Sequence, residues 1–254
     1  MHGESATQPS PGHVILREQF RYFRLDNDPT PQNREVDQWD ALTWLEVGLR
    51  HNLALSIRVP LSFRWEESDW IDGTDQAAGV SDITTMLKWR ILKKDSGPLD
   101  SARLSLLGGA EIRSGDSDFS SDSYDPIVGL VYTQIRGRHG FNAGASWKFT
   151  TDGNKDPLYV GESKADLLRY DASYLFRLYP SKFEADSHGA WYAVAELTGY
   201  YETDGDHEIL LSPCLMYEGR NRMLELAVQL PALQELDHRP ETRYVIVAGL
   251  RFLF

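Results

Sequence analysis

The last eleven residues, YVIVAGLRFLF, constrain the fold of this chain more than any other segment. Counting back from the end, every second residue is apolar: Phe254, Phe252, Leu250, Ala248, Ile246 and Tyr244. A period of two predicts a β-strand with two different faces, and about 9–11 tilted residues are enough to cross a bilayer. Chain termini usually fray. An apolar strand that ends on a free aromatic residue therefore favours a membrane-spanning sheet over a soluble one.

This ending resembles the C-terminal targeting strand of Gram-negative outer-membrane barrels. In that family, the barrel-assembly machinery reads the terminal aromatic residue and the alternating apolar residues before it. The resemblance implies that this machinery, and the lipid and lipopolysaccharide of the cell outer membrane, are partners of the chain. It also implies a membrane-targeting strand that includes Tyr244, Ile246, Leu250, Phe252 and Phe254.

Segments of alternating polarity recur along the whole chain. We expect strands near 16–25, 41–50, 53–63, 81–92, 102–112, 127–136, 140–149, 165–178, 190–201, 207–218, 222–230 and 243–254. Strands can span a bilayer only as a closed barrel, because open sheet edges would leave backbone groups unpaired in lipid. The predicted fold is an all-β, closed antiparallel transmembrane barrel of about 12 strands, and it occupies residues 15–254.

The predicted connections differ in length from one side of the barrel to the other. Long polar connections fall at 26–40, 64–80, 113–126, 150–164 and 231–242, and tight turns at 50–52, 137–139 and 218–221. Outer-membrane barrels have short periplasmic turns and longer extracellular loops. With an even number of strands, both termini are then expected to be periplasmic.

A soluble β-barrel or sandwich is the alternative fold, because a period of two does not say which face is inside. Aromatic residues near the strand ends favour the membrane barrel, since they are typical of girdles at the two membrane interfaces. These residues are Phe63, Trp147, Phe149, Tyr201, Tyr217, Phe252 and Phe254. The charged faces of the strands are then expected to point into the lumen.

The alternation gives a set of candidate lumen residues along a solute path. They are Arg58, Lys88, Arg90, Glu111, Arg169, Asp171, Arg177 and Glu196. Such charges either pair across strands and stabilise a small barrel, or form a polar lining that selects solutes. The sequence leaves both interpretations open.

Composition excludes several classes of protein. The formal net charge is −12 with no basic stripe, so nucleic acid is not an expected partner. The single cysteine, Cys214, rules out an internal disulfide and argues against a thiolate metal cluster. No segment approaches the ~18 apolar residues of a transmembrane helix. No apolar stretch follows Met1, so we expect that an exported chain has already lost its signal peptide.

Two acidic segments have the composition of calcium loops. Residues 65–75 (WEESDWIDGTD) are dense in carboxylates, but their spacing matches no known calcium cage and favours a solvated loop. Residues 202–208 (ETDGDHE) contain Asp204-Gly205, which is a favourable pair for a type I′ hairpin turn. We therefore expect no metal and no cofactor.

Enzymes occur among outer-membrane barrels, and those that act on lipid need Ser/His or Asp/His pairs near the extracellular end. Only His207 and His238 map to that side, and no motif places a serine beside either. We expect the chain not to be an enzyme, with a lipid-modifying enzyme as the least favoured alternative.

Residues 79–83 (GVSDI), which run into 84–92, resemble a strand start of the phenol-degradation meta-pathway family, a transporter-like group of Gram-negative outer-membrane β-barrels. Residues 161–170, 174–178 and 247–254 are similar in style. The resemblance implies uptake of small, often aromatic or hydrophobic molecules.

We expect a monomeric, porin-like channel for a small-molecule solute. A plugged barrel with a structural or surface-interaction role is the alternative. Residues 1–14 are either a disordered amino-terminal tail, which their composition favours, or a segment that lies in the lumen.

Overall fold

The computed structural model describes residues 3–97, 100–154, 156–183 and 188–254. They form thirteen strands: β1 (Val14–Asp26), β2 (Glu35–Arg50), β3 (Leu53–Glu67), β4 (Thr74–Val80), β5 (Ile83–Asp95), β6 (Ser101–Ile112), β7 (Asp125–Arg136), β8 (His139–Lys148), β9 (Leu167–Tyr179), β10 (Gly189–Glu202), β11 (His207–Gly219), β12 (Arg222–Glu235) and β13 (Glu241–Leu253). Within these residues there is no helix long and apolar enough to cross a membrane.

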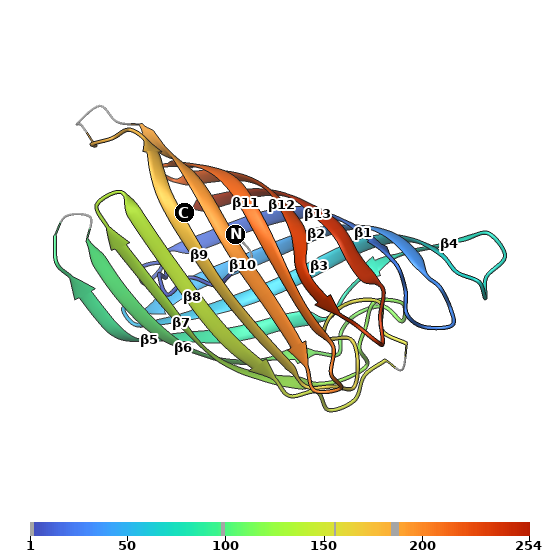
Figure 1. The fold of residues 1–254 in the computed structure, drawn as a ribbon. Helices are drawn as coiled ribbons and strands as arrows, with labels where there is room; N and C mark the ends of the chain where they lie inside the picture. The colour runs from blue at the N-terminus through green and yellow to red at the C-terminus, as the bar shows by residue number, and fades with distance from the viewer. Residues whose placement is uncertain (1–2, 98–99, 155, 184–187) are drawn as a thin grey trace.

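Neighbouring strands pair antiparallel around a closed ring (Figure 1). The ring closes where β1 pairs with both β2 and β13, in a register that joins Ile15 to Leu253 and Asp26 to Glu241. Val14 and Phe254 exchange two backbone hydrogen bonds, of 3.1 and 2.9 Å, so the first and last strands meet at the same end of the barrel. The predicted closed antiparallel barrel with about twelve strands is confirmed, and the structure adds one short strand.

The added strand is β4, which lies in a segment predicted to be a loop. β4 pairs with the second half of β3, from Leu61↔Val80 to Glu67↔Thr74, whereas β5 pairs with the first half of β3, from Leu53 to Arg58. Strand β2 also starts at Glu35, earlier than predicted, and pairs with β3 as far as Glu67. The polar composition of these residues suited a loop, but their backbone pairs as a sheet extending beyond the rim (Figure 1).

The two faces of each strand differ in exposure as the alternation predicted. On β12, Leu224 and Leu226 are 46% and 59% exposed on the outside, whereas Glu225 and Ala227 are buried inside. On β13, Ile246, Phe252 and Phe254 point outward, whereas Val245 and Val247 are buried. The outside of the barrel is therefore a broad apolar surface, which is the arrangement that lipid stabilises.

The lumen is not uniformly polar. The candidate lumen residues predicted from the sequence were all charged and gave no sign of an apolar part. Inward side chains of β10 to β13 form an apolar cluster of Val194, Cys214, Met216, Met223, Ala227, Val245 and Val247. Beside it, Glu225 binds Arg17 and Gln19 of β1, at 2.5 and 2.8 Å. This packed side fills part of the barrel, and open space remains beside it, lined by side chains from Arg21 of β1 to Tyr200 of β10.

Candidate functional site in the barrel lumen

The amino-terminal segment enters the lumen from the end where the strands are joined by short turns, here called the turn end. Gly3 N donates to Glu196 Oε1 at 2.7 Å, and Ala6 N donates to Thr133 Oγ1 at 2.9 Å. Ala6 is fully buried. The composition-based preference for a disordered tail is therefore wrong for residues 3–8, which lie inside the barrel; residues 1 and 2 lie outside the described residues.

Gly48 on the inner face of β2 lets this segment enter. Gly48 N donates to the carbonyl of His13 at 3.1 Å, and its own carbonyl accepts from Gly12 N at 3.0 Å. A Cβ atom at position 48 would lie 2.2 Å from the carbonyl oxygen of Ser10. Only glycine leaves room for the chain to pass so closely.

Glu4 places its carboxylate against two cations of the barrel wall. It forms an ion pair with Arg58 of β3, and its Oε2 lies 3.2 Å from Nζ of Lys88 on β5. Lys88 also binds Glu46 Oε1 at 3.0 Å and is 2% exposed. The guanidinium of Arg58 lies 4.1 Å above the ring of Trp44, a cation–π contact. Two charged wall residues thus hold the segment electrostatically.

A second segment, residues 149–166, folds into the opposite, loop end of the barrel. Lys148 Nζ donates to the carbonyl of Gly161 at 2.5 Å and to Glu111 Oε1 at 2.9 Å. Gly161 N in turn donates to Glu202 Oε1 at 3.0 Å. Burial raises the pKa of Glu162, which faces the lumen, although Arg64 and two backbone N–H donors oppose the rise. This inward loop narrows the lumen from the side opposite to the amino-terminal segment.

Asp82 holds a third segment, residues 113–124, at the same end. Its carboxylate accepts from the backbone N–H of Ser114, Gly115 and Ser121 at 2.7 to 2.9 Å, and from the hydroxyls of Ser120 and Ser121. Burial alone would raise the pKa of Asp82, but these hydrogen bonds outweigh it and hold the pKa below its usual value. The Gly79–Asp82 motif thus has a structural role in closing the loop end.

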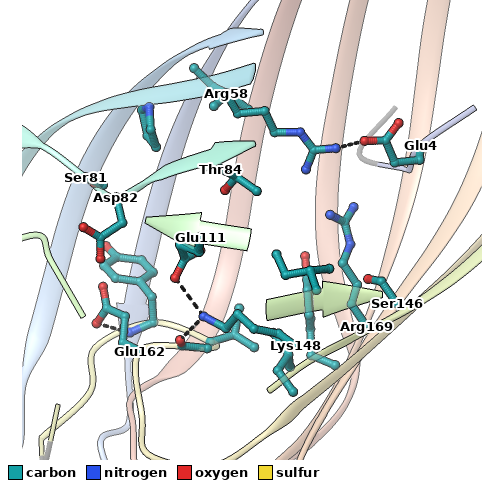
Figure 2. Close-up of a pocket in the computed structure, with 18 of the residues that line it drawn as sticks. Glu4, Arg58, Ser81, Asp82, Thr84, Glu111, Ser146, Lys148, Glu162 and Arg169 are labelled. Atoms are coloured by element: carbon teal, nitrogen blue, oxygen red, sulfur yellow. Dashed lines mark hydrogen bonds and ion pairs between the residues drawn. The ribbon is translucent and has the colours of Figure 1, made fainter. Parts of the chain in front are cut away.

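A chamber of about 370 Å³ lies between the amino-terminal segment and the two inward loops. Figure 2 shows that Arg58 and Arg169 point toward Glu4, and that Lys148 and Glu111 line the chamber nearer the loop end. Its wall also carries apolar side chains: Phe23, Met86, Leu107, Phe119, Ile127, Val131 and Leu167. The chamber therefore combines charged groups with apolar surface, as small-molecule sites do.

The structure brings most of the candidate solute-path residues together. Arg58, Glu111, Arg169 and Asp171 line the chamber, and Lys88 and Glu196 contact the amino-terminal segment.

The other two candidates lie away from the chamber, nearer the turn end. Arg90 binds the carbonyl of His51, and Arg177 packs over the ring of Phe183 at 4.2 Å.

Glu4, Thr133 and Asn142 were missed. Alternation within a strand cannot show that an irregular segment will occupy the lumen.

Asp204, Asp206 and His238 meet at the rim of the loop end, with one ligand atom of each within 4.8 Å of the others. Asp206 Oδ1 accepts from Asp237 N at 2.8 Å and lies 3.0 Å from His238 Nδ1. The bond to Asp206 raises the pKa of His238, so the three residues already form an ion-paired turn contact. His207, the other histidine on this side, bonds Tyr170 through Nε2 at 2.8 Å.

No protein-family model and no curated protein sequence matches this chain. Among solved structures, the COG4313 outer membrane channel from Pseudomonas putida F1 is similar over 100% of both chains, with a TM-score of 0.64 and 12% sequence identity. The beta domain of the Bordetella autotransporter BrkA is similar over 95% of this chain and 99% of its own, with a TM-score of 0.57 and 10% identity. At these identities the likeness is one of fold, and both neighbours share the barrel architecture.

Proposed function

We propose that the protein is a monomeric outer-membrane channel of a Gram-negative bacterium that passes a small molecule. The single observation that carries the proposal is the chamber of about 370 Å³, which lies inside a closed barrel between the amino-terminal segment and the two inward loops. The apolar outer surface supports a location in lipid, and the similar fold of a known outer membrane channel supports transport.

The orientation proposed has both termini in the periplasm. Short turns such as 137–138 and 220–221 lie at the end where Val14 and Phe254 meet, whereas the long inward loops lie at the other end. The exposed aromatic residues of β13 support recognition by the barrel-assembly machinery, with lipid and lipopolysaccharide as the surrounding partners. Deletion of Phe254 should then slow insertion into the outer membrane without changing export of the chain to the periplasm.

Single-channel recording in planar bilayers tests the proposal. The folded protein should give discrete current steps, and heat-unfolded protein at the same concentration should give none. A variant that lacks residues 1–8 should give larger steps, because it loses the segment that now fills the turn end. If neither protein conducts, the channel proposal is wrong.

A plugged barrel with a structural or surface-interaction role is the second candidate. The buried contacts of Gly3, Glu4 and Ala6 favour it, since they fix the segment across the lumen. We propose that the protein is not an enzyme: His238 pairs with Asp206, but neither His238 nor His207 has a serine hydroxyl among its described hydrogen-bond partners. Hydrolysis of outer-membrane lipid by the wild type, lost in H207A or H238A, would overturn that view.

A further inference from the structure

We propose that Arg58 and Lys88 form a binding site for the carboxylate of a small organic acid with an apolar body. Glu4 of the chain's own amino-terminal segment occupies that site when no such acid is present. A solute carboxylate and Glu4 therefore compete, and binding of the solute releases the segment from the lumen. This inference rests on the proposed channel function and names its substrate class.

The bonding of Arg58 is the first reason. Among the described residues, Glu4 is the one carboxylate within ion-pair distance of Arg58. The Arg58 Nε atom is buried and makes no hydrogen bond. Without the segment, the buried guanidinium would therefore lose its ion-pair partner, which is costly unless another anion takes the place. The planar guanidinium is also the group best suited to a carboxylate, which it can bind through two nitrogens.

The contacts of Lys88 make it a second, weaker contact for the incoming anion. Lys88 also pairs with Glu46 at 3.0 Å, so its charge has a counter-ion other than Glu4. Its Nζ still lies 3.2 Å from Glu4 Oε2 and 3.4 Å from the carbonyl of Thr7. Lys88 can therefore donate to the second oxygen of an incoming carboxylate. Arg58 supplies the positive charge that has no ion-pair partner once Glu4 has left.

The segment itself is held in a way that permits release. Apart from the Glu4 ion pairs, its polar contacts are single hydrogen bonds: Gly3 N to the Glu196 carboxylate, Ala6 N to the Thr133 hydroxyl and Asn142 Nδ2 to the Glu4 carbonyl. Of its described residues, Ala6 alone belongs to an apolar cluster, which it shares with Met86, Leu107 and Val131. Hydrogen bonds of this kind are readily replaced by water. The Glu4 ion pairs are thus the strongest element of the attachment.

Apolar surface near the Arg58–Glu4 pair indicates what the part of the ligand beyond its carboxylate should be. Met86, Leu107, Val131 and Phe23 line the chamber on one side, and Trp44 stacks on Arg58 on the other. When Ala6 leaves its cluster, the exposed side chains offer an apolar wall next to the cationic site. A carboxylate with an aromatic or aliphatic body matches this combination, whereas a small inorganic anion would use only the charge.

Competition with a tethered group predicts a characteristic affinity pattern. A residue on a short flexible tether acts at an effective concentration of the order of millimolar. An organic acid must exceed that competition, so removal of the Glu4 charge should strengthen its binding. If Glu4 merely stabilised the site, removal of its charge should instead weaken the binding of the organic acid.

The test is binding of benzoate to the full-length protein in detergent, followed by tryptophan fluorescence, with benzamide as the neutral isostere. We expect wild type to bind benzoate and not benzamide. E4Q should bind benzoate at least about 5-fold more tightly, and R58Q at least about 10-fold more weakly. E218Q, which removes a carboxylate that pairs with Arg251 at 2.6 Å near the turn end, should stay within about 2-fold of wild type.

R58K guards against a folding defect in R58Q. It keeps the charge but loses the planar fork, so it should bind benzoate more weakly than wild type and more tightly than R58Q. Heat-modifiable migration of each variant on gels shows whether the barrel has folded. Equal binding of benzoate and benzamide, or unchanged benzoate affinity in E4Q, would overturn the proposal.

Bilayer recordings separate this inference from the channel proposal. Benzoate should raise the open probability of wild type, benzamide should not, and E4Q should be open without either. If benzoate leaves the conductance unchanged and benzamide binds as tightly as benzoate, the carboxylate site is wrong, whereas the channel proposal still holds. If the protein binds benzoate but not benzamide and never conducts, the channel proposal is wrong, whereas the carboxylate site still holds.

Discussion

Lys148 Nζ lies 2.5 Å from the carbonyl oxygen of Gly161, and this contact ties the inward loop at 149–166 to the wall strand β8. The same ammonium is the counter-ion of Glu111 at 2.9 Å and lies 3.6 Å from Asp125. One buried cation thus fixes the loop and balances two wall carboxylates. The position of the loop-end constriction depends on this side chain.

Replacement of Lys148 by Gln should therefore both destabilise the barrel and widen the lumen at the loop end. Loss of one partner of a buried ion pair costs about 3–5 kcal/mol, because the remaining charge stays buried. Urea unfolding in lipid vesicles measures the first effect and single-channel conductance the second. K164Q is the matched control, since Lys164 lies on the same loop in an exposed pair with Asp152; it should change stability by less than about 1 kcal/mol. Equal effects of K148Q and K164Q would refute the role of Lys148.

Acid should loosen the segment at 113–124 through Asp82. The pKa of Asp82 is lower in the folded protein than in the unfolded chain, so its carboxylate stabilises the fold above the unfolded value of about 3.9. That contribution is lost as the pH falls through the lower, folded pKa. The amide resonances of Ser114 and Ser121 should shift together at this step in an NMR titration. In D82N the step should be absent and the segment should be mobile at pH 6; a wild-type titration with no such step would contradict the assignment.

A methyl group at Gly48 should displace the amino-terminal segment without altering any charge. The added Cβ would lie 2.2 Å from the Ser10 carbonyl oxygen and 2.7 Å from that of Pro9, and backbone atoms cannot move aside cheaply. G48A should therefore raise single-channel conductance. G108A is the control, because a Cβ at Gly108 meets nothing within 4 Å. The explanation fails if the two variants conduct alike.

The outward face of β12 should be sensitive to charge according to depth. Leu226 is 59% exposed and pairs with Ala248, midway between the aromatic residues Tyr244 and Phe252 of β13, where lipid is expected to cover it. L226R should lower the free energy of unfolding in bilayers by about 2–4 kcal/mol, whereas L233R, near the strand end, should cost about 0–1 kcal/mol. Denaturant titration of the vesicle-inserted proteins measures both. Similar small costs at both positions would argue against a membrane location.

Much of the barrel could be predicted because its information is local. Inward and outward positions follow from a period of two, so the outward face of β13 was predicted from residues such as Ile246 and Phe252 alone. The boundaries of β2 and β3 were set too short, since polar residues beyond the rim still pair with each other. Composition gives no sign of such pairing when neither face is buried in lipid or core.

The candidate site was predicted only in part. Arg58, Lys88 and Asp171 were placed in the lumen by their strands, and the structure brings them together there. Glu4 was not found, because residues 3–8 have no periodicity and their composition is that of a disordered segment. Their position is decided by contacts with residues far away in the sequence, such as Glu196, 193 places from Gly3, and Thr133, 127 places from Ala6.

The sequence by itself determined the closed sheet, the lipid-facing and lumen-facing sides of the strands that it predicted, and the end at which the two terminal strands meet. Each of these follows from short-range alternation and connection length. Only the tertiary structure decided what fills the lumen. Whether Glu4 meets Arg58, or Lys148 meets Gly161, depends on the curvature that brings distant strands around one cavity, and no local pattern encodes that distance.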